Sequence, residues 1–231
     1  NLPNNNFTPN TLSLHAGYDY DSQRTLSVPI YQSTAYSFEN AEQAAARFSL
    51  EELGNIYSRL TNPTVDMLAK RIAAVEGGAF GVATASGSSA VFYSLVNLAQ
   101  NGDNIAYSNK IYGGSQTLLV HVLKRFGIEG RVFDIDNLSS LEKIIDDKTK
   151  AIFFESLSNP QIAIADVETI TNIAKKHKIV TICDNTVATP ILFRPFDFGV
   201  DVSVHSLTKY INGQIPAGAF VPTQVRGLNG T

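Results

Sequence analysis

The sequence predicts an α/β fold in which a mostly parallel sheet is flanked by helices, and three observations carry this prediction. The 231 residues are 44% hydrophobic and 17% charged, which suffices for a sizeable core and excludes a disordered chain, collagen or a coiled coil. From residue 62 onward, short apolar segments alternate with segments of helical periodicity. Turn residues such as Gly102-Asp103 separate the segments, and this alternation is typical of parallel β-α-β crossovers.

Residues 1–60 form the least regular part of the chain, with one short helix predicted over 41–48. The next helix is expected to begin at Pro63, because proline suits the first helical turn, and to end at Gly77. Its apolar positions recur at helical spacing, at Val65, Leu68, Ile72 and Val75.

Beyond Gly77 the pattern predicts a regular series of strands and helices. The strands are expected over 80–84, 105–107, 131–133, 151–154, 179–183 and 200–204. The helices are expected over 86–99, 115–126, 138–145 and 167–177. Because ligands of such sheets bind beyond the carboxyl ends of the strands, the residues that follow each strand are the candidates for a site.

Charge and composition narrow the class of partner. The net charge of −3 argues against a general nucleic-acid binder. No apolar run reaches the roughly 18 residues of a membrane-spanning helix, so no membrane partner is expected. The single cysteine, Cys183, cannot form an internal disulfide and is interpreted as a core residue of a protein from a reducing, cytoplasmic compartment. The four histidines lack metal-ligand spacing, so no metal is expected.

Small residues open the helix that follows the strand over 80–84. Ser86, Gly87 and Ser88 would present free N–H groups and the positive end of the helix dipole, which suit a phosphate. Serine is also a preferred helix cap, so an ordinary cap is the alternative. The dinucleotide-binding glycine pattern and the P-loop are both missing, which disfavours a nucleotide site.

Two ionisable residues follow later strands. Asp184 either caps the next segment or serves as the counter-ion of a protonated heteroaromatic nitrogen, as in pyridoxal-phosphate sites. Lys209 is either an ordinary solvated lysine or, beside the hydroxyls of Ser206 and Thr208, a Schiff-base lysine next to a phosphate. The spacing of Ser206 and Lys209 also matches the serine-nucleophile motif of penicillin-recognising enzymes, but the partner motifs Ser-Asp-Asn and Lys-Thr-Gly are missing.

Three further residues have both an ordinary and a functional interpretation. Tyr112 is either a core aromatic or a ring that stacks on a planar cofactor. Asn159 precedes Pro160 and by itself signals a turn. Arg59, two residues after Tyr57, is either a surface charge or a phosphate ligand.

Together these motifs resemble the Cys/Met-metabolism family of pyridoxal 5'-phosphate (PLP)-dependent enzymes, which have a fold-type I transferase domain. The resemblance covers most of the chain and rests on Tyr57-Ser58-Arg59 with Asn62-Pro63-Thr64, Tyr112-Gly113-Gly114, the segment 155–160, Asp184-Asn185-Thr186 and the segment 206–210. Within the family the chain is most similar to the O-acetylhomoserine sulfhydrylases. The long segment over 48–57, the segment over 184–190, and Gly114 in place of the cysteine typical of methionine γ-lyases support this.

The resemblance implies PLP as the cofactor and gives each motif a role. Lys209 would form the Schiff base and move protons, Asp184 would keep the pyridine nitrogen protonated, and Tyr112 would stack on the ring and assist the leaving group. The other implied cofactor contacts are Asn159 at the ring hydroxyl, Gly87, Ser88, Ser206 and Thr208 at the phosphate, Ser86 and Thr186 nearby, and Tyr57 and Arg59 from a neighbouring subunit.

The resemblance also implies an organisation and an activity. Residues 1–60 would form an arm that contacts a neighbouring subunit, and residues 61–231 the PLP-binding α/β domain, in a homodimer that builds a homotetramer. The implied activity is that of an aminocarboxypropyltransferase of methionine biosynthesis, which makes homocysteine from O-acetylhomoserine and a sulfur donor. The alternatives are a cystathionine γ-synthase or methionine γ-lyase type of reaction, and a non-catalytic binding module with the same fold.

Family members are longer than this chain, and the only methionine, Met67, is internal. We therefore expect a trimmed, tagged or partial chain that lacks the C-terminal domain, and we expect residues 215–231 to depart from the family.

Overall fold

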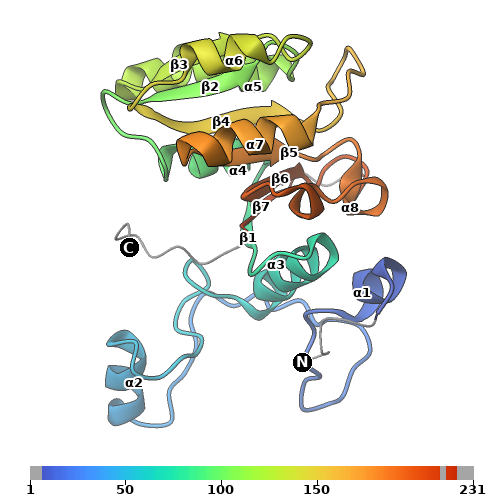
Figure 1. Cartoon of the computed structure of the whole chain (residues 1–231). Helices are drawn as coiled ribbons and strands as arrows, with labels where there is room; N and C mark the ends of the chain where they lie inside the picture. The colour runs from blue at the N-terminus through green and yellow to red at the C-terminus, as the bar shows by residue number, and fades with distance from the viewer. Residues whose placement is uncertain (1–6, 214–216, 223–231) are drawn as a thin grey trace. The chain divides into compact units, whose positions relative to one another are not determined.

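The computed structural model describes residues 7–213 and 217–222. Its contacts divide the chain into two compact units, Asn1–Arg71 and Ile72–Thr231. Helix α3 (Pro63–Glu76) contains the boundary between them (Figure 1). The helix predicted to begin at Pro63 is thus continuous, and the division lies inside it.

In the first unit, residues 7–71 contain two short helices besides the start of α3. Helix α2 (Ala41–Phe48) has the predicted bounds and is capped by Asn40, whose side chain accepts a hydrogen bond from the Gln43 N–H at 2.7 Å. Helix α1 (Pro9–His15) was not predicted from the sequence. It buries only Leu12, so it has no apolar periodicity to reveal it.

The second unit is built on a sheet whose described strands number seven, in the order β1-β7-β6-β5-β4-β2-β3. The strands are β1 (Val82–Thr84), β2 (Asn104–Ser108), β3 (Glu129–Phe133), β4 (Thr149–Glu155), β5 (Val180–Asp184), β6 (Val202–Ser206) and β7 (Gly218–Pro222). Strands β2 to β6 pair in parallel, whereas β7 is antiparallel to both β1 and β6. The predicted mostly parallel sheet is confirmed.

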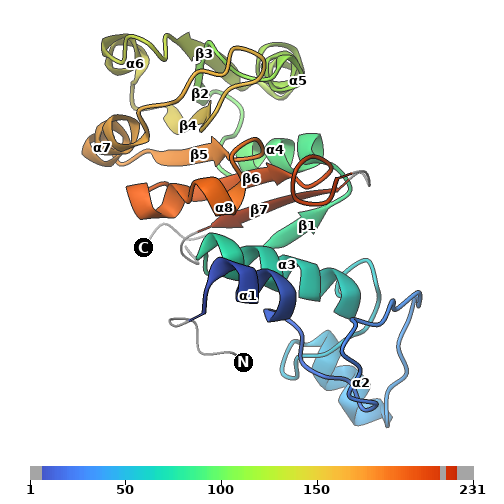
Figure 2. The ribbon, with the colours of Figure 1, turned by 90° about the vertical axis from the view of Figure 1, so that its right-hand side faces the viewer.

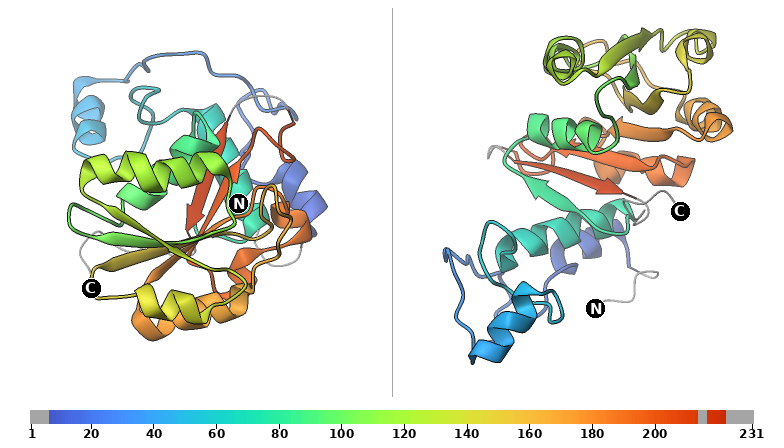
Figure 3. Two further views of the ribbon diagram at one scale, coloured as in Figure 1. Left: turned by 90° about the horizontal axis from the view of Figure 1, so that it is seen from above. Right: turned by 90° about the vertical axis from the view of Figure 1, so that its left-hand side faces the viewer.

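Helices cover both faces of this sheet (Figures 2 and 3). On one face lie α4 (Gly87–Val96), α5 (Gly113–Thr117) and the π and 3-10 turns that continue α5 over Leu118–Val122 and Leu123–Phe126. On the other lie α6 (Ser139–Ile144) and α7 (Val167–His177). After β5 come α8 (Thr189–Leu192) and a 3-10 turn over Pro195–Phe198.

Strand β4 shows why the core has two halves. Phe153 packs among the residues under α4, and its neighbour Phe154 packs among those under α7; both are fully buried. Successive side chains point to opposite faces of a sheet, so a strand covered on both faces is apolar throughout. Cys183 is buried in the α7 half, as predicted.

Strand β7 was not predicted from the sequence. No element was expected after Gln214, yet residues 218–222 form a strand inside the sheet. Gly218 belongs there because a Cβ at this position would lie 2.2 Å from the carbonyl oxygen of Ser86, which leaves room for no other residue. Residues 214–216 and 223–231 lie outside the described part of the chain.

Helix α7 has the predicted bounds and supplies a test of capping. Asp166 precedes it, and the Asp166 carboxylate accepts hydrogen bonds from the Thr169 N–H (3.1 Å) and the Thr169 hydroxyl (2.7 Å). We expect Asp166→Ala to lower the free energy of unfolding by about 1 kcal/mol, the usual cost of a lost N-cap. Urea unfolding measures this, with Glu168→Ala on the same helix as the control. An equal loss in both variants would contradict the capping role.

No helix within residues 7–213 or 217–222 is long and apolar enough to cross a membrane. In the same part of the chain, no three His, Cys, Asp or Glu residues are grouped so as to hold a metal ion.

Candidate active site

Two carboxylates end adjacent strands of the sheet. Glu155 closes β4, Asp184 closes β5, and the two residues are paired in register. Burial raises the pKa of Glu155 to about 7, and the charge of Asp184 adds to this rise. Desolvation likewise raises the pKa of Asp184. The carboxyl ends of β4 and β5 therefore bring a buried carboxyl group next to a partly buried one.

Hydrogen bonds from Thr186 act against the rise that desolvation causes in the pKa of Asp184. The N–H and the hydroxyl of Thr186 both donate to Oδ1 of Asp184, at 3.0 and 2.5 Å, and such bonds favour the ionised carboxylate. The Thr186 hydroxyl in turn accepts a hydrogen bond from the Ser206 N–H at 2.8 Å. Thr186 thus joins the end of β5 to the end of β6.

Ser86 is the N-cap of α4, which agrees with the ordinary interpretation of this serine. Its side chain accepts a hydrogen bond from the Ser89 N–H at 3.1 Å. The N–H groups of Gly87 and Ser88 precede the first intrahelical bonds and point out of the helix end, as in any α-helix. The cap and a phosphate site are therefore compatible at this turn.

Gly87 and Ser206 lie against each other. A Cβ at Gly87 would be 2.6 Å from the Cβ of Ser206, so only glycine fits between the start of α4 and the end of β6. The next turn carries Thr208, which accepts from the Ala217 N–H at 3.1 Å, and Lys209, whose N–H donates to the Ser206 carbonyl at 3.2 Å. The side chain of Lys209 is exposed.

Tyr112 and Asn159 are brought to the same edge through Glu155. The Tyr112 N–H donates to Oε1 of Glu155 at 2.6 Å, and the Asn159 N–H donates to Oε2 at 3.0 Å. Tyr112 is 52% exposed, so it is not the core aromatic that was the alternative interpretation. Direct contacts or register pairs link most of the predicted site residues of the second unit: Gly87, Tyr112, Asn159, Asp184, Thr186, Ser206 and Lys209. Ser86, Ser88 and Thr208 adjoin members of this set in the sequence, at the start of α4 and in the turn after β6.

The other two predicted residues, Tyr57 and Arg59, belong to the first unit. Tyr57 forms a β-bridge with Ala35, and the guanidinium carbon of Arg59 lies 5.3 Å from the centre of the Tyr57 ring. Asn62, which is buried, fixes this loop by donating to the Tyr31 carbonyl at 2.9 Å. The motif residues of the first unit thus form one connected cluster.

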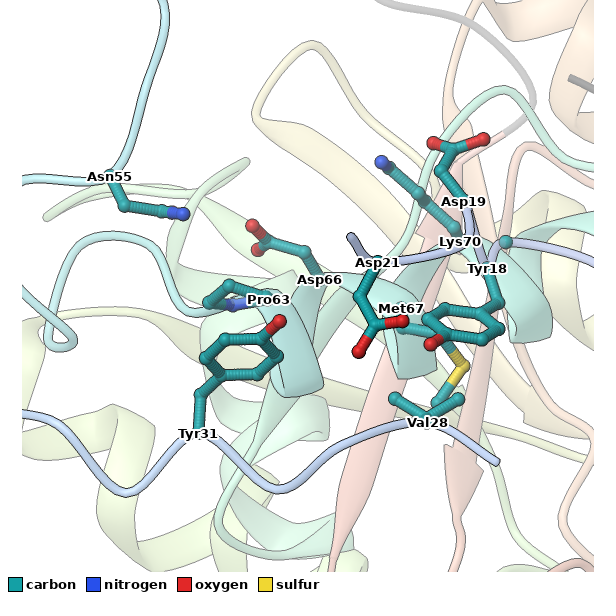
Figure 4. A pocket seen from close by; sticks show the side chains of 11 residues that line it. Tyr18, Asp19, Asp21, Val28, Tyr31, Asn55, Pro63, Asp66, Met67 and Lys70 are labelled. Carbon is teal, nitrogen blue, oxygen red and sulfur yellow. The ribbon is translucent and has the colours of Figure 1, made fainter. Parts of the chain in front are cut away.

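A separate pocket of about 240 Å³ also lies within the first unit (Figure 4). Its lining includes Tyr18, Asp21, Tyr31 and Met67, together with Asp66, whose pKa is raised by burial. None of the predicted site residues lines it.

A buried polar cluster next to the site escaped the sequence reasoning. His205 Nε2 and Glu76 Oε1 are 2.7 Å apart, and the Ser203 hydroxyl donates to the same Glu76 oxygen. All three side chains are fully buried. Burial raises the pKa of Asp184, and the neighbouring His205 is among the groups that act against this rise. The histidine directly before Ser206 was the available signal, but its partner Glu76 is far away in the sequence.

A comparison with known protein families identifies the family of this chain. The family described as Cys/Met metabolism PLP-dependent enzyme matches residues 10–221. The chain belongs to this family. The resemblance inferred from the sequence is confirmed, and the departure expected after Gln214 was wrong for residues 215–221.

The relatives of this Cys/Met-metabolism PLP-dependent chain include proteins named as sulfhydrylases and proteins named as gamma-lyases. The O-acetyl-L-homoserine sulfhydrylase of Corynebacterium glutamicum is 45% identical over 205 residues, which are 88% of this chain and 47% of that protein. The L-methionine gamma-lyase of Pseudomonas putida is 40% identical over 217 residues, which are 93% of this chain and 54% of that protein. The chain thus spans about half the length of the curated relatives it matches.

A solved structure confirms the fold. It comes from Campylobacter jejuni and is described as an O-acetylhomoserine (thiol)-lyase with N'-pyridoxyl-lysine-5'-monophosphate. It is 68% identical in sequence, has a TM-score of 0.92, and the match covers 95% of this chain and 55% of that one. The predicted fold-type I PLP-dependent domain is therefore present.

The residues at the sheet edge fit PLP, the cofactor of the Cys/Met-metabolism family. The glycine at position 87 lets the start of α4 approach Ser206 closely, which places the N–H groups of that turn beside the Ser206 hydroxyl, a combination that suits a phosphate. The desolvated carboxylate of Asp184 suits a protonated ring nitrogen. The exposed amine of Lys209 suits an aldehyde carbonyl.

The raised pKa of Glu155 predicts a pH dependence of stability. Its pKa rises from 4.5 in an exposed glutamate to about 7 in the cofactor-free fold, so between these values the folded state binds more protons than the unfolded chain. The contribution to stability is therefore fully present below about pH 4.5 and is lost as the pH rises through 7. We expect Glu155→Gln to remove this slope, measured by urea unfolding at several pH values. Parallel pH profiles of the two proteins would contradict the prediction.

Proposed function

We propose that the protein is a PLP-dependent γ-replacement enzyme that makes homocysteine and acetate from O-acetylhomoserine and hydrogen sulfide or another sulfur donor. The observation that carries the proposal is the continuous set of contacts from Gly87 through Ser206, Thr186 and Asp184 to the Glu155-bound Tyr112. The similarity to proteins named for O-acetylhomoserine supports this choice of substrate.

In this proposal, residues at different strand ends bind different parts of the cofactor. The N–H groups of Gly87 and Ser88 and the hydroxyls of Ser206 and Thr208 hold its phosphate. Asp184, whose ionised form is favoured by its two bonds from Thr186, holds the proton on the ring nitrogen.

The remaining residues act on the substrate side. PLP, when bound, supplies an electron sink for negative charge at the substrate Cα and Cβ. The Lys209 amine removes the proton from Cα and later returns one to the substrate. Tyr112 covers a ring face, excludes water there and assists departure of acetate from Cγ.

The proposal includes a second copy of the chain. Tyr57 and Arg59 reach the phosphate of a neighbouring subunit, residues 1–60 form the arm that makes this contact, and dimers pair into a cytoplasmic tetramer without nucleic-acid or membrane partners. Large apolar side chains that the first unit leaves exposed, such as Leu26 and Leu53, support an arm that packs on a partner.

Methionine γ-elimination is the second candidate, because the similarity to an L-methionine gamma-lyase extends over nearly the whole chain. A product assay on the full-length protein separates the candidates. Homocysteine and acetate from O-acetylhomoserine with sulfide are the expected products. Methanethiol and 2-oxobutyrate from methionine as the main products would favour elimination, cystathionine formed with cysteine would favour cystathionine synthesis, and PLP binding without turnover would favour a binding module.

A further inference from the structure

Glu155 ties together the loops that follow two neighbouring strands. β2 and β4 lie side by side, and Tyr112 follows the first while Asn159 follows the second. One carboxylate oxygen of Glu155 accepts the N–H of Tyr112, and the other accepts the N–H of Asn159. The carboxylate is therefore a bridge between the two backbones.

The bridge is buried, whereas the side chains that it places are not. Glu155 is only 6% exposed, but Tyr112 and Asn159 both face outward. Tyr112 stands at the N-cap of α5 without a side-chain cap, so Glu155 supplies the acceptor at this helix start. Among the described residues no cation forms an ion pair with Glu155, so its acceptors serve backbone N–H groups.

A carboxylate at this position has an electrostatic cost, and its two bonds to the loop N–H groups offset that cost. Glu155 is buried and lies beside the partly buried Asp184 in register, and two adjacent carboxylates repel each other. Glutamine has the same shape and would remove the repulsion. However, the amide nitrogen of glutamine cannot accept a hydrogen bond. The amide oxygen would accept one of the two N–H groups, and the other N–H would face the NH2 group, which is also a donor.

We propose that Glu155 is a positioning residue that sets the distance between Tyr112 and Asn159, the two side chains that contact the cofactor ring in the proposed function. The inference rests on that function for the identity of the ring contacts. The bridge between the two loops stands independently of it.

The test compares Glu155→Gln with wild type and with Glu142→Gln in the full chain at pH 8. Glu142 is an exposed glutamate of α6 that pairs with Lys176 at 3.0 Å, so it undergoes the same chemical change away from the sheet edge. We expect the dissociation constant for PLP to rise about tenfold in Glu155→Gln, the effect of one lost hydrogen bond to a charged group. Glu142→Gln should leave it unchanged.

Two further readouts separate positioning from a general loss of structure. The circular dichroism of bound PLP should change in Glu155→Gln, because Tyr112 no longer lies at a fixed place on the ring. Amide hydrogen exchange on the cofactor-free protein should show faster exchange at Tyr112, at Asn159 or at both, with the amides of β4 unaffected. Unchanged PLP affinity together with unchanged exchange at both amides would overturn the proposal.

The exchange measurement also keeps the inference testable if Glu155→Gln does not fold. In wild type alone, rapid exchange at both Tyr112 and Asn159 would overturn the bridge. If wild type binds no PLP but both amides are protected, the proposed function fails while the bridge is supported.

Discussion

Lys209→Ala is expected to lower kcat for the conversion of O-acetylhomoserine to homocysteine by about a thousandfold or more, the range associated with losing a proton-transferring nucleophile. The turn after β6 holds the Lys209 backbone through the bond from its N–H to the Ser206 carbonyl. The variant therefore removes the amine without altering the strands that hold Asp184 and Ser206. Product formation and the visible absorption of the bound cofactor measure the effect.

Lys143→Ala is the matched control, because Lys143 is an exposed lysine on α6. It should retain the wild-type rate and spectrum. If Lys209→Ala retained both as well, Lys209 would be the ordinary solvated lysine of the alternative interpretation.

Glu76→Ala is expected to destabilise the fold by about 3 kcal/mol, as is typical when the loss of one partner leaves a buried polar group unpaired beside a new cavity. Glu76 ends α3, and its Oε1 atom meets both His205 and Ser203 of β6 where no water reaches. Alanine would leave the imidazole of His205 without its main partner and open a cavity. Urea unfolding of the cofactor-free protein measures the change.

Glu142→Ala removes an exposed carboxylate of α6 and should change the stability by less than about 1 kcal/mol. A loss in Glu76→Ala that is no larger than this would mean that the buried cluster adds nothing to the stability of the fold.

The elements predicted best from the sequence are those in which buried and exposed positions follow a regular pattern along the chain. Helix α7 has one face on the core and polar residues on the other, and its bounds agreed with the prediction. Strand β4 is apolar because both of its faces are covered. Helix α1 has one buried residue, and the segment over 115–126 begins two residues early and changes to π and 3-10 turns, which apolar spacing does not reveal.

The site was predictable to the extent that parallel strands end at one edge. Asp184 and Ser206 follow neighbouring strands, so the proximity of their turns follows from the fold class alone. The bridge from Glu155 to Tyr112 spans 43 positions of the sequence and depends on β4 lying next to β2. Nothing in the local pattern specifies that strand order, so Glu155 was noticed in a motif but received no role.

The place of β7 in the sheet has a consequence for the order in which the chain folds. β1 pairs with the rest of the sheet only through β7 among the described strands, although the paired residues Thr84 and Gly218 are far apart in the sequence. During synthesis, β2 to β6 are complete before β7 emerges, so β1 cannot pair with the sheet until β7 has been made. Closing such a long loop is slow. We therefore expect the turn at Ser86, against which Gly218 packs, to assemble after β2 to β6 during synthesis.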